Sequence, residues 1–275
     1  MKMNGWMRSA AILMVALFVF TIPGSAITWG EPDLTNQYAN VGSIVVVRPE
    51  REPLQFCTGT LIDATLFLSA GHCTSYLEQL ITDGVLTPET IKVSFDALNI
   101  FDPAGWIDVA QIATHPEYGS LEYNNPHDVG VLILEAAPAG ISPAALPEEG
   151  FLEQLKREKI LGDGPEKAKF IVAGYGTTIN WPPPEVLDNG VGRYVALSEY
   201  RAIMKPWLLM SQNHNLGNAG TCFGDSGGPA FIEYNGQLVL VGITSWGDPN
   251  CVATGFDYRV DIPETLDFIA PFLAP

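Results

Sequence analysis

Three short stretches of the sequence carry side chains that could act together in covalent catalysis. His72 lies in Leu-Ser-Ala-Gly-His-Cys, Asp128 heads the apolar run Val-Gly-Val-Leu-Ile-Leu, and Ser226 lies in Cys-Phe-Gly-Asp-Ser-Gly-Gly-Pro. A serine hydroxyl is a poor nucleophile at neutral pH and needs an adjacent base, for which histidine has a suitable pKa. Taken singly, His72 would be a structural histidine and Asp128 a turn residue at the start of a strand. Ser226 is harder to explain as a simple loop, because its glycine-rich segment lies in an apolar region bounded by a cysteine.

The segments around these residues predict an all-β protein. Short runs rich in Val, Ile, Phe and Tyr alternate with Gly and Pro, and Asn235-Gly236 marks a two-residue hairpin. The expected strands are 43–47, 60–62, 66–70, 91–95, 129–134, 170–173, 193–198, 229–233, 237–245 and 255–260. A Pro- and Ala-rich stretch over 136–150 and a charged helix over 151–160 separate the two sets. The pattern therefore indicates two β domains, followed by a short amphipathic helix.

The composition indicates a folded, acidic protein. The 275 residues are 47% hydrophobic and 16% charged, which excludes a disordered chain and is enough for one large or two small domains. There are 14 Lys and Arg residues against 31 Asp and Glu residues, and the net charge is −17. This charge disfavours nucleic acid and anionic membrane surfaces as partners. We expect no cofactor, and the sequence leaves the oligomeric state open.

The N-terminus has the pattern of a secretory signal peptide. Lys2 and Arg8 precede an apolar run over 10–20, and Gly24-Ser25-Ala26 supplies small residues for cleavage. The alternative is a membrane anchor, but a span needs about 20 apolar residues and this run is shorter. We therefore expect a secreted protein, extracellular or periplasmic, whose mature chain begins at Ile27.

The cysteines fit an oxidising compartment with two disulfides, and the residues alone leave three pairings open. The four positions are Cys57, Cys73, Cys222 and Cys251. Their spacing does not match a zinc knuckle. His115, His127 and His214 also lack metal-ligand spacing, so we expect solvated or locally bonded imidazoles and no metal site.

Taken together, the three stretches are similar to those of the trypsin- and chymotrypsin-like serine proteases. The order His, Asp, Ser is that of this family and not of the subtilisins or α/β-hydrolases. Gly174-Tyr175-Gly176 and Ser245-Trp246-Gly247 also match, and the resemblance extends from Ile27 to the C-terminal helix. It implies two packed six-stranded antiparallel β-barrels. The expected divisions are a signal peptide (1–26), a barrel with the His and Asp (27–140), a connection (141–169), a barrel with the Ser (170–262) and a helix (263–275).

The resemblance implies hydrolysis of peptide bonds in a peptide or protein substrate, through an acyl-enzyme. His72 would take the proton of Ser226 and return it to the leaving amine, while Asp128 would hold the imidazole in the right tautomer. Ser245 would lie beside Asp128. The backbone N–H groups of Gly224 and Ser226 would bind the developing oxyanion.

The resemblance also assigns the aspartate before the nucleophile and the cysteines. A buried Asp225 needs a positive partner, which in the family is the mature N-terminal ammonium group. The expected signal cut exposes Ile27, so our hypothesis is that signal cleavage itself creates the activating terminus, with no separate zymogen stage. The alternative is an aspartate capped within a turn. The implied disulfides are Cys57–Cys73 and Cys222–Cys251.

The family motif places glycines around the pocket for the substrate side chain before the cut bond. Gly220 would be its floor, with Gly247 and Gly255 as walls beside Ser245 and Trp246. Trypsins carry an acid at the floor, so the usual partner of Arg or Lys is missing here. We therefore expect Phe, Tyr, Leu or Met, through apolar burial worth about 1.5–3 kcal/mol.

Asp257 leaves a second specificity open. It lies two residues past Gly255, where the family often has an aromatic side chain. If its carboxylate turned into the pocket, it would accept Arg or Lys. If it paired with Arg259 or solvent, it would have no part in specificity.

Two other functions remain as alternatives to the peptidase. A catalytically silent binding module of the same fold would usually lack a triad residue, whereas all three are present. An esterase would use the same triad, because acyl transfer is shared by both reactions.

Overall fold

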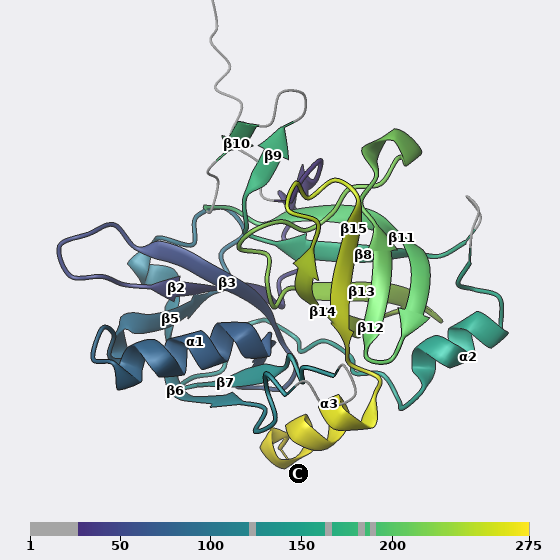
Figure 1. Ribbon diagram of the computed structural model, residues 1–275. Coiled ribbons are helices and arrows are strands. Elements are labelled where there is room, and N and C mark those ends of the chain that lie inside the picture. Colours follow the sequence, from purple (N-terminus) through teal and green to yellow (C-terminus); the bar gives the residue numbers. More distant parts are fainter. Residues whose placement is uncertain (1–26, 121–124, 163–166, 181–184, 188–190, 275) are drawn as a thin grey trace, which may run out of the picture.

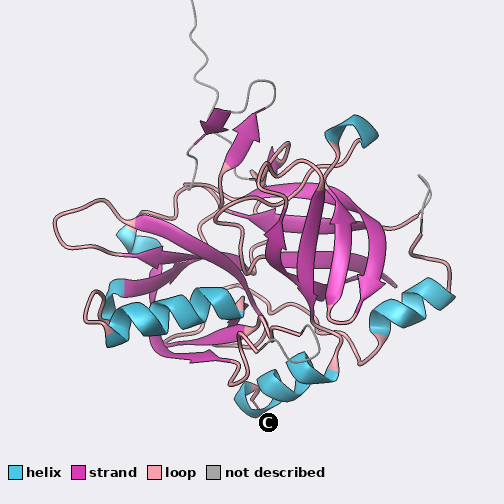
Figure 2. Cartoon of the chain, in the orientation of Figure 1, coloured by secondary structure: helices cyan, strands magenta, loops and turns pink. Residues whose placement is uncertain are grey.

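Two β-barrels lie side by side, with the helices at their periphery (Figure 1). The structure is a computed structural model that describes residues 27–120, 125–162, 167–180, 185–187 and 191–274. The expected signal peptide over 1–26 lies outside the described residues. Strands make up most of the regular structure (Figure 2). The prediction of two six-stranded antiparallel barrels with a short C-terminal helix is confirmed.

The first barrel is closed in the order β2-β3-β4-β7-β6-β5. Its strands are β2 (Val41–Val46), β3 (Leu54–Leu61), β4 (Leu66–Ser69), β5 (Ile91–Ser94), β6 (Trp106–Thr114) and β7 (Gly130–Leu134). Alternate side chains of a strand point to opposite faces, so each strand contributes residues to the barrel interior. Ile44, Phe67 and Val93 are fully buried there.

The second barrel follows the order β11-β12-β15-β14-β13-β8, and β8 pairs with β11 to close it. Its strands are β8 (Lys169–Gly174), β11 (Tyr194–Met204), β12 (Trp207–Ser211), β13 (Pro229–Tyr234), β14 (Gln237–Gly247) and β15 (Thr254–Arg259). The short β1 (Glu31–Pro32) pairs with β11. A separate hairpin consists of β9 (Thr178–Asn180) and β10 (Glu185–Leu187).

The helices are short and lie outside the barrels (Figure 2). They are α1 (Gly71–Thr82), α2 (Phe151–Arg157) and α3 (Pro263–Ile269), with 3₁₀ turns η1 (Pro88–Thr90), η2 (Pro103–Gly105), η4 (His214–Leu216) and η5 (Ala270–Phe272). The charged segment expected as a helix over 151–160 is helical as α2, which ends at Arg157. Among the described residues, no helix has the length and apolarity needed to cross a membrane.

Several elements are absent from the sequence prediction, among them the short β1, β9 and β10 and the longer β6, β12 and α1. The strand β6 was missed because Asp108 and Gln111 interrupt its apolar pattern. The strand β12 was missed although its residues are apolar. The helix α1 contains Leu77, Leu80 and Ile81 at helical spacing, a signal that could have revealed it.

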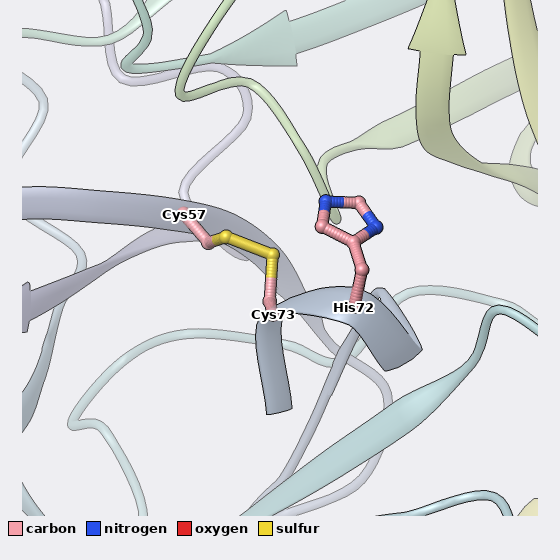
Figure 3. A group of neighbouring side chains, drawn as sticks. All are labelled: Cys57, His72 and Cys73. Carbon is pink, nitrogen blue, oxygen red and sulfur yellow. A yellow bond between two sulfur atoms is a disulfide. The ribbon is translucent and has the colours of Figure 1, made fainter. Parts of the chain in front are cut away.

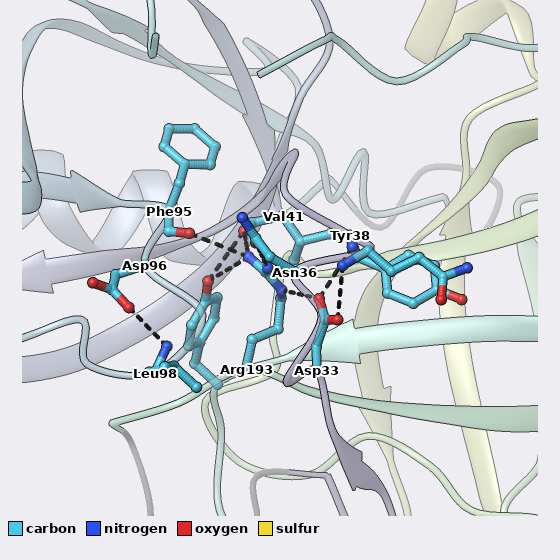
Figure 4. A network of polar contacts seen from close by, with 10 residues as sticks. Asp33, Asn36, Tyr38, Val41, Phe95, Asp96, Leu98 and Arg193 are labelled. Atoms are coloured by element: carbon cyan, nitrogen blue, oxygen red, sulfur yellow. Dashed lines mark hydrogen bonds and ion pairs between the residues drawn. The ribbon is translucent and has the colours of Figure 1, made fainter. Parts of the chain in front are cut away.

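A buried arginine joins the two barrels (Figure 4). Arg193 is fully buried, and its Nε donates to Asp33 Oδ2 at 2.9 Å. Its Nη1 donates to the carbonyl oxygen of Val41 at 2.8 Å and to the Tyr175 hydroxyl at 2.9 Å. Burial raises the pKa of Tyr175 to about 12, although Arg193 opposes this rise. The network ties the start of β2 to the segments that precede β11 and follow β8.

Candidate active site

The first turn of α1 positions His72. The helix begins at Gly71, and its N-cap residue Ala70 offers no side-chain cap. The carboxylate of Asp128 takes this place, since its Oδ1 accepts the backbone N–H of His72 at 2.7 Å. The same carboxylate accepts from the imidazole, with 3.0 Å between His72 Nδ1 and Asp128 Oδ2. The aspartate therefore fixes both the backbone and the ring of His72.

Asp128 is held as an ion in a buried position. It lies just before β7 and is 4% exposed. Burial raises the pKa of its carboxyl, but the hydrogen bonds and charge of His72 and a hydrogen bond from the Ser245 hydroxyl outweigh this and hold the pKa below its ordinary value. An ionised Asp128 can stabilise an imidazolium at His72.

Ser226 lies in the loop between β12 and β13, which is fastened to the first barrel. Its carbonyl oxygen accepts the backbone N–H of Thr58 in β3 at 2.8 Å. The Thr58 hydroxyl donates to the carbonyl oxygen of Gly224 at 3.0 Å. Gly227 has a φ of +83°, and a Cβ atom there would approach Ser69 Oγ to 2.1 Å. The turn that presents Ser226 thus requires glycine at this position.

His72 and Ser226 line the same cleft, which has a volume of about 550 Å³. Both side chains are partly exposed. The contacts of the described residues include no hydrogen bond between the Ser226 hydroxyl and the imidazole. Catalytic hydrogen bonds are often long before substrate binds. The structure thus brings together all three residues predicted from sequence, with the His–Asp pair in direct contact.

The two N–H groups predicted to bind an oxyanion lie at the same turn. Gly224 has a φ of +94°, and its carbonyl oxygen accepts hydrogen bonds from the side chains of Gln55 and Thr58. Within the described part of the chain, neither Gly224 N nor Ser226 N donates to a protein acceptor. Two N–H groups of this kind are free to bind a developing negative charge.

Asp225, next to Ser226 in the chain, is fully buried. Its carboxylate accepts the backbone N–H groups of Gly176 and Cys222, each at 2.8 Å. Burial raises its pKa to about 7, because these two hydrogen bonds offset only part of the desolvation. Ile27 is also fully buried, and Thr28 exchanges backbone hydrogen bonds of 2.9 and 3.1 Å with Gly220. The segment that would form the mature N-terminus is therefore anchored beside the nucleophile loop.

Both disulfides have the pairing that the resemblance implied. Cys57 joins Cys73, and Cys222 joins Cys251. Figure 3 shows the first disulfide beside His72, linking β3 to α1. The nearness of two sulfurs to an imidazole does not make a metal site here, since the thiolate is the ligand and both sulfurs are bonded to each other.

The space between the pocket glycines is filled, contrary to the expectation of an open pocket. A Cβ atom at Gly220 would meet the Gln212 side chain at 2.2 Å, and one at Gly255 would meet Gln212 Nε2 at 2.9 Å. Gln212 is 2% exposed. Its Nε2 donates to the carbonyl oxygen of Thr221 at 3.0 Å, while its Oε1 has no hydrogen-bond partner among the described residues. Sequence analysis missed Gln212, because its role depends on the pairing of β12 with β15.

Asp257 does not pair with Arg259 or solvent, which corrects the second of the two placements considered from sequence. Arg259 instead contacts Asp261 and Glu153. Asp257 is fully buried, and within the part of the chain that the structure describes neither carboxyl oxygen has a hydrogen-bond partner. Burial raises its pKa to about 8. It lies on the same face of β15 as Gly255, because residues two apart on a strand share a face.

Comparison with known proteins agrees with this fold. Residues 27–269 match the family model described as Trypsin, so the chain belongs to the trypsin family. It is 29% identical to a phenoloxidase-activating enzyme of Bombyx mori, over 91% of this chain and 59% of that protein. It is 28% identical to vitamin K-dependent protein C of Rattus norvegicus, over 70% of this chain and 40% of that protein. It is 26% identical to the serine proteinase stubble of Drosophila melanogaster, over 70% of this chain and 24% of that protein. The chain thus spans about a quarter to three-fifths of these relatives.

Proposed function

We propose that this protein is a secreted serine endopeptidase that uses Ser226 as its nucleophile. The observation that carries the proposal is the pairing of a buried, ionised Asp128 with His72 in the cleft that also contains Ser226. Membership of the trypsin family and the relatives named as proteinases support it. The signal-like N-terminus and the two disulfides support secretion.

In the proposed reaction, His72 Nε2 takes the proton of the Ser226 hydroxyl as the oxygen attacks the scissile carbonyl carbon. The carbonyl oxygen becomes an oxyanion bound by the N–H groups of Gly224 and Ser226. The imidazolium then gives its proton to the leaving amine, the C–N bond breaks, and an ester to Ser226 remains. Water, deprotonated by His72, attacks this ester and releases the acid, which restores the serine hydroxyl.

The Ser226→Ala variant tests this function against the silent-module alternative. Peptidase activity of the variant should fall by several powers of ten, while secretion and thermal unfolding stay unchanged. His72→Ala should be about as damaging, and the double variant little worse, because the triad acts as a unit. Undiminished hydrolysis by Ser226→Ala would remove the proposal. A folded wild type that hydrolyses esters but no peptide would favour the esterase.

For the substrate side chain before the cut bond, the surroundings of the expected pocket favour Arg or Lys over an apolar side chain. Gln212 narrows the pocket, which suits a thin aliphatic stem better than an aromatic ring. Gln212 Oε1 and both Asp257 oxygens are buried acceptors with no donor in the described structure. The terminal N–H groups of Arg or Lys would supply donors. We therefore infer a preference for Arg or Lys, in place of the apolar preference expected from the glycines.

Matched peptides that end in Arg or Phe before the cut bond test this preference. We expect kcat/KM to favour Arg by at least about tenfold, and Asp257→Asn to remove most of that advantage. In Gln212→Gly, which clears the space between Gly220 and Gly255, kcat/KM for Phe should rise. A wild type that prefers Phe would restore the apolar assignment.

The activating pair remains part of the proposal. In the described structure, Asp225 accepts from two backbone N–H groups and has a raised pKa, and an ammonium group at Ile27 would lower that pKa and hold the loop that carries Ser226. N-terminal sequencing of the secreted protein should begin at Ile27, and acetylation of that amine should reduce activity. A fully active secreted protein that begins well before Ile27 would contradict the activation hypothesis.

A further inference from the structure

A second cavity lies beside the segment that begins the expected mature chain. Its volume is about 520 Å³, which is within the range of ligand pockets, and its lining includes none of the proposed triad residues. The lining comes from strands β1 and β11 and from the loop that contains η4. The side chains that could recognise a ligand there are those of Trp29, Glu31, Leu197 and Asn218.

Trp29 and Leu197 give the cavity an apolar surface. The indole of Trp29 stacks on the His214 ring, with 4.1 Å between centroids and 17° between planes. Trp29 is still 36% exposed, and its backbone φ of +63° is unfavourable for a side chain of this size. Leu197 is 49% exposed. A fixed indole beside an exposed aliphatic side chain suits a ligand that has an apolar stem.

Glu31 gives the same cavity a negative charge. It is exposed in β1, and the ion pairs between described residues do not include it. The other acid of the lining, Asp33, is buried in its ion pair with Arg193. The described lining contains no Lys or Arg. A cationic group on the ligand would therefore be attracted to Glu31.

Asn218 adds a buried acceptor that lacks a donor. The residue is 1% exposed, and its Nδ2 donates to Glu199 Oε2 at 3.1 Å. An ionised carboxylate only accepts hydrogen bonds, so this contact fixes which end of the amide faces Glu199. The other end, Asn218 Oδ1, has no hydrogen-bond partner among the described residues. Leaving a buried acceptor unpaired costs free energy, which an N–H donor on a ligand would recover.

We propose that this cavity binds an arginine side chain of a partner protein or peptide. The guanidinium group is always charged, is planar and carries five N–H donors. It pairs with Glu31 and donates to Asn218 Oδ1, while its aliphatic stem packs on Trp29 and Leu197. Lysine has the charge but not the planar set of donors. A metal ion fits less well, because the indole and the leucine supply no ligand atoms.

Titration with the peptide acetyl-Ala-Arg-Ala-amide tests the site. The matched control ligand has citrulline in place of arginine, which keeps the shape and removes the charge. Ser226→Ala protein is used so that the result is independent of peptidase activity. Indole N–H signals of ¹⁵N-labelled protein, assigned with single Trp→Phe variants, report where the peptide binds. We expect a saturable shift of the Trp29 signal with a Kd below about 1 mM, and no saturable shift with citrulline.

Glu31→Gln tests the charge, because it keeps the size of an exposed side chain and should leave the fold intact. We expect the Kd for the arginine peptide to rise at least about threefold. The matched control is Glu135→Gln, which alters an exposed carboxylate just after β7 in the first barrel. Its Kd should equal that of the parent.

Three results would overturn the site. The first is a Trp29 signal with no saturable shift, including the case in which only the Trp246 signal moves, since the peptide would then lie at the expected substrate pocket. The second is equal binding of the citrulline and arginine peptides. The third is an equal Kd for the arginine peptide in folded Glu31→Gln and Glu135→Gln.

Discussion

Asp128 accepts hydrogen bonds from three donors: the backbone N–H of His72, the His72 ring and the hydroxyl of Ser245. One carboxylate thereby caps the N-terminus of helix α1, orients the imidazole and contacts a strand of the second barrel. Buried charges persist only where such donors compensate for lost water. At the scale of single residues, the donors to Asp128 are as much a part of the site as the carboxylate itself.

Replacing Ser245 with alanine removes one of these donors. We expect kcat/KM to fall about 10–100-fold, because a hydrogen bond to a charged group contributes about 1.5–3 kcal/mol. Steady-state kinetics on one peptide measures this. The control is Ser198→Ala, which removes a buried hydroxyl that donates to Ala219 in the second barrel. Equal kinetic losses in both variants would mean that Ser245 acts only on stability.

Asp257 should make stability depend on pH. Its pKa is about 8 in the folded chain and about 3.9 when unfolded, so folding is penalised as the pH rises. The penalty is absent below about pH 4, grows between the two pKa values and is complete above about pH 8. We expect Asp257→Asn to gain up to a few kcal/mol of unfolding free energy at pH 8 and much less at pH 4.

Urea unfolding in the Ser226→Ala background at pH 4, 6 and 8 measures this difference. Asp225 also has a raised pKa, about 7, and therefore also lowers stability as the pH rises. Because Asp225 is present with and without the Asp257→Asn change, its contribution cancels in the difference. A gain that is the same at all three pH values would show that Asp257 is paired or ionised in the folded state.

Between elements, the site depends on connections from the first barrel to the nucleophile loop. Strand β3 supplies Thr58, whose N–H and hydroxyl hold Ser226 and Gly224. The same strand is joined to α1 by Cys57–Cys73. The loop itself is joined to the segment before β15 by Cys222–Cys251. The two disulfides therefore restrain different parts of the site.

Removing the Cys222–Cys251 disulfide, with both cysteines changed to alanine, should reduce kcat/KM more than bulk stability. Cys222 donates its N–H to Asp225, so freeing this loop disturbs the turn that presents Ser226. Removal of Cys57–Cys73 is the matched comparison. We expect removal of either disulfide to lower the unfolding free energy by about 2–4 kcal/mol. We expect the larger loss of kcat/KM when Cys222–Cys251 is removed. A larger kinetic loss for the second would contradict this account of the loop.

At the scale of the whole molecule, the proposed triad is divided between the two barrels, so the proposed function requires them to keep a fixed relation. The Arg193 network lies at their junction, and Arg193 itself is fully buried. Its ion pair with Asp33 is compensated by several further hydrogen bonds. Removing one partner of a buried ion pair leaves an uncompensated charge and lowers stability. Replacing both partners with apolar residues can leave stability nearly unchanged.

Arg193→Met should therefore lower the unfolding free energy by about 3–5 kcal/mol. The double variant Arg193→Met, Asp33→Leu should recover part of this loss. Denaturant unfolding of the three proteins measures both effects. A double variant less stable than Arg193→Met would show that the hydrogen bonds, and not the unpaired charge, determine the cost.

The sequence predicted the parts of the molecule that local patterns encode. Alternating apolar runs revealed most strands, and the glycine-rich segment identified Ser226 and its neighbours. The sequence could not predict contacts that depend on strand register. Gln212 fills the space of two glycines, and Asp257 is buried without Arg259, because the pairing of β12, β14 and β15 decides both. His115 and His127, whose imidazole rings stack with 4.6 Å between centroids, likewise meet only through the pairing of β6 with β7.

The most direct test of the central claim is labelling of the purified, folded protein with a fluorophosphonate, followed by peptide mapping. An activated serine is required for this reaction, so the label reports nucleophile, base and oxyanion site together. We predict one label per chain, on Ser226, and loss of labelling in His72→Ala. Folded protein that stays unlabelled, or carries the label on another residue, would contradict the account.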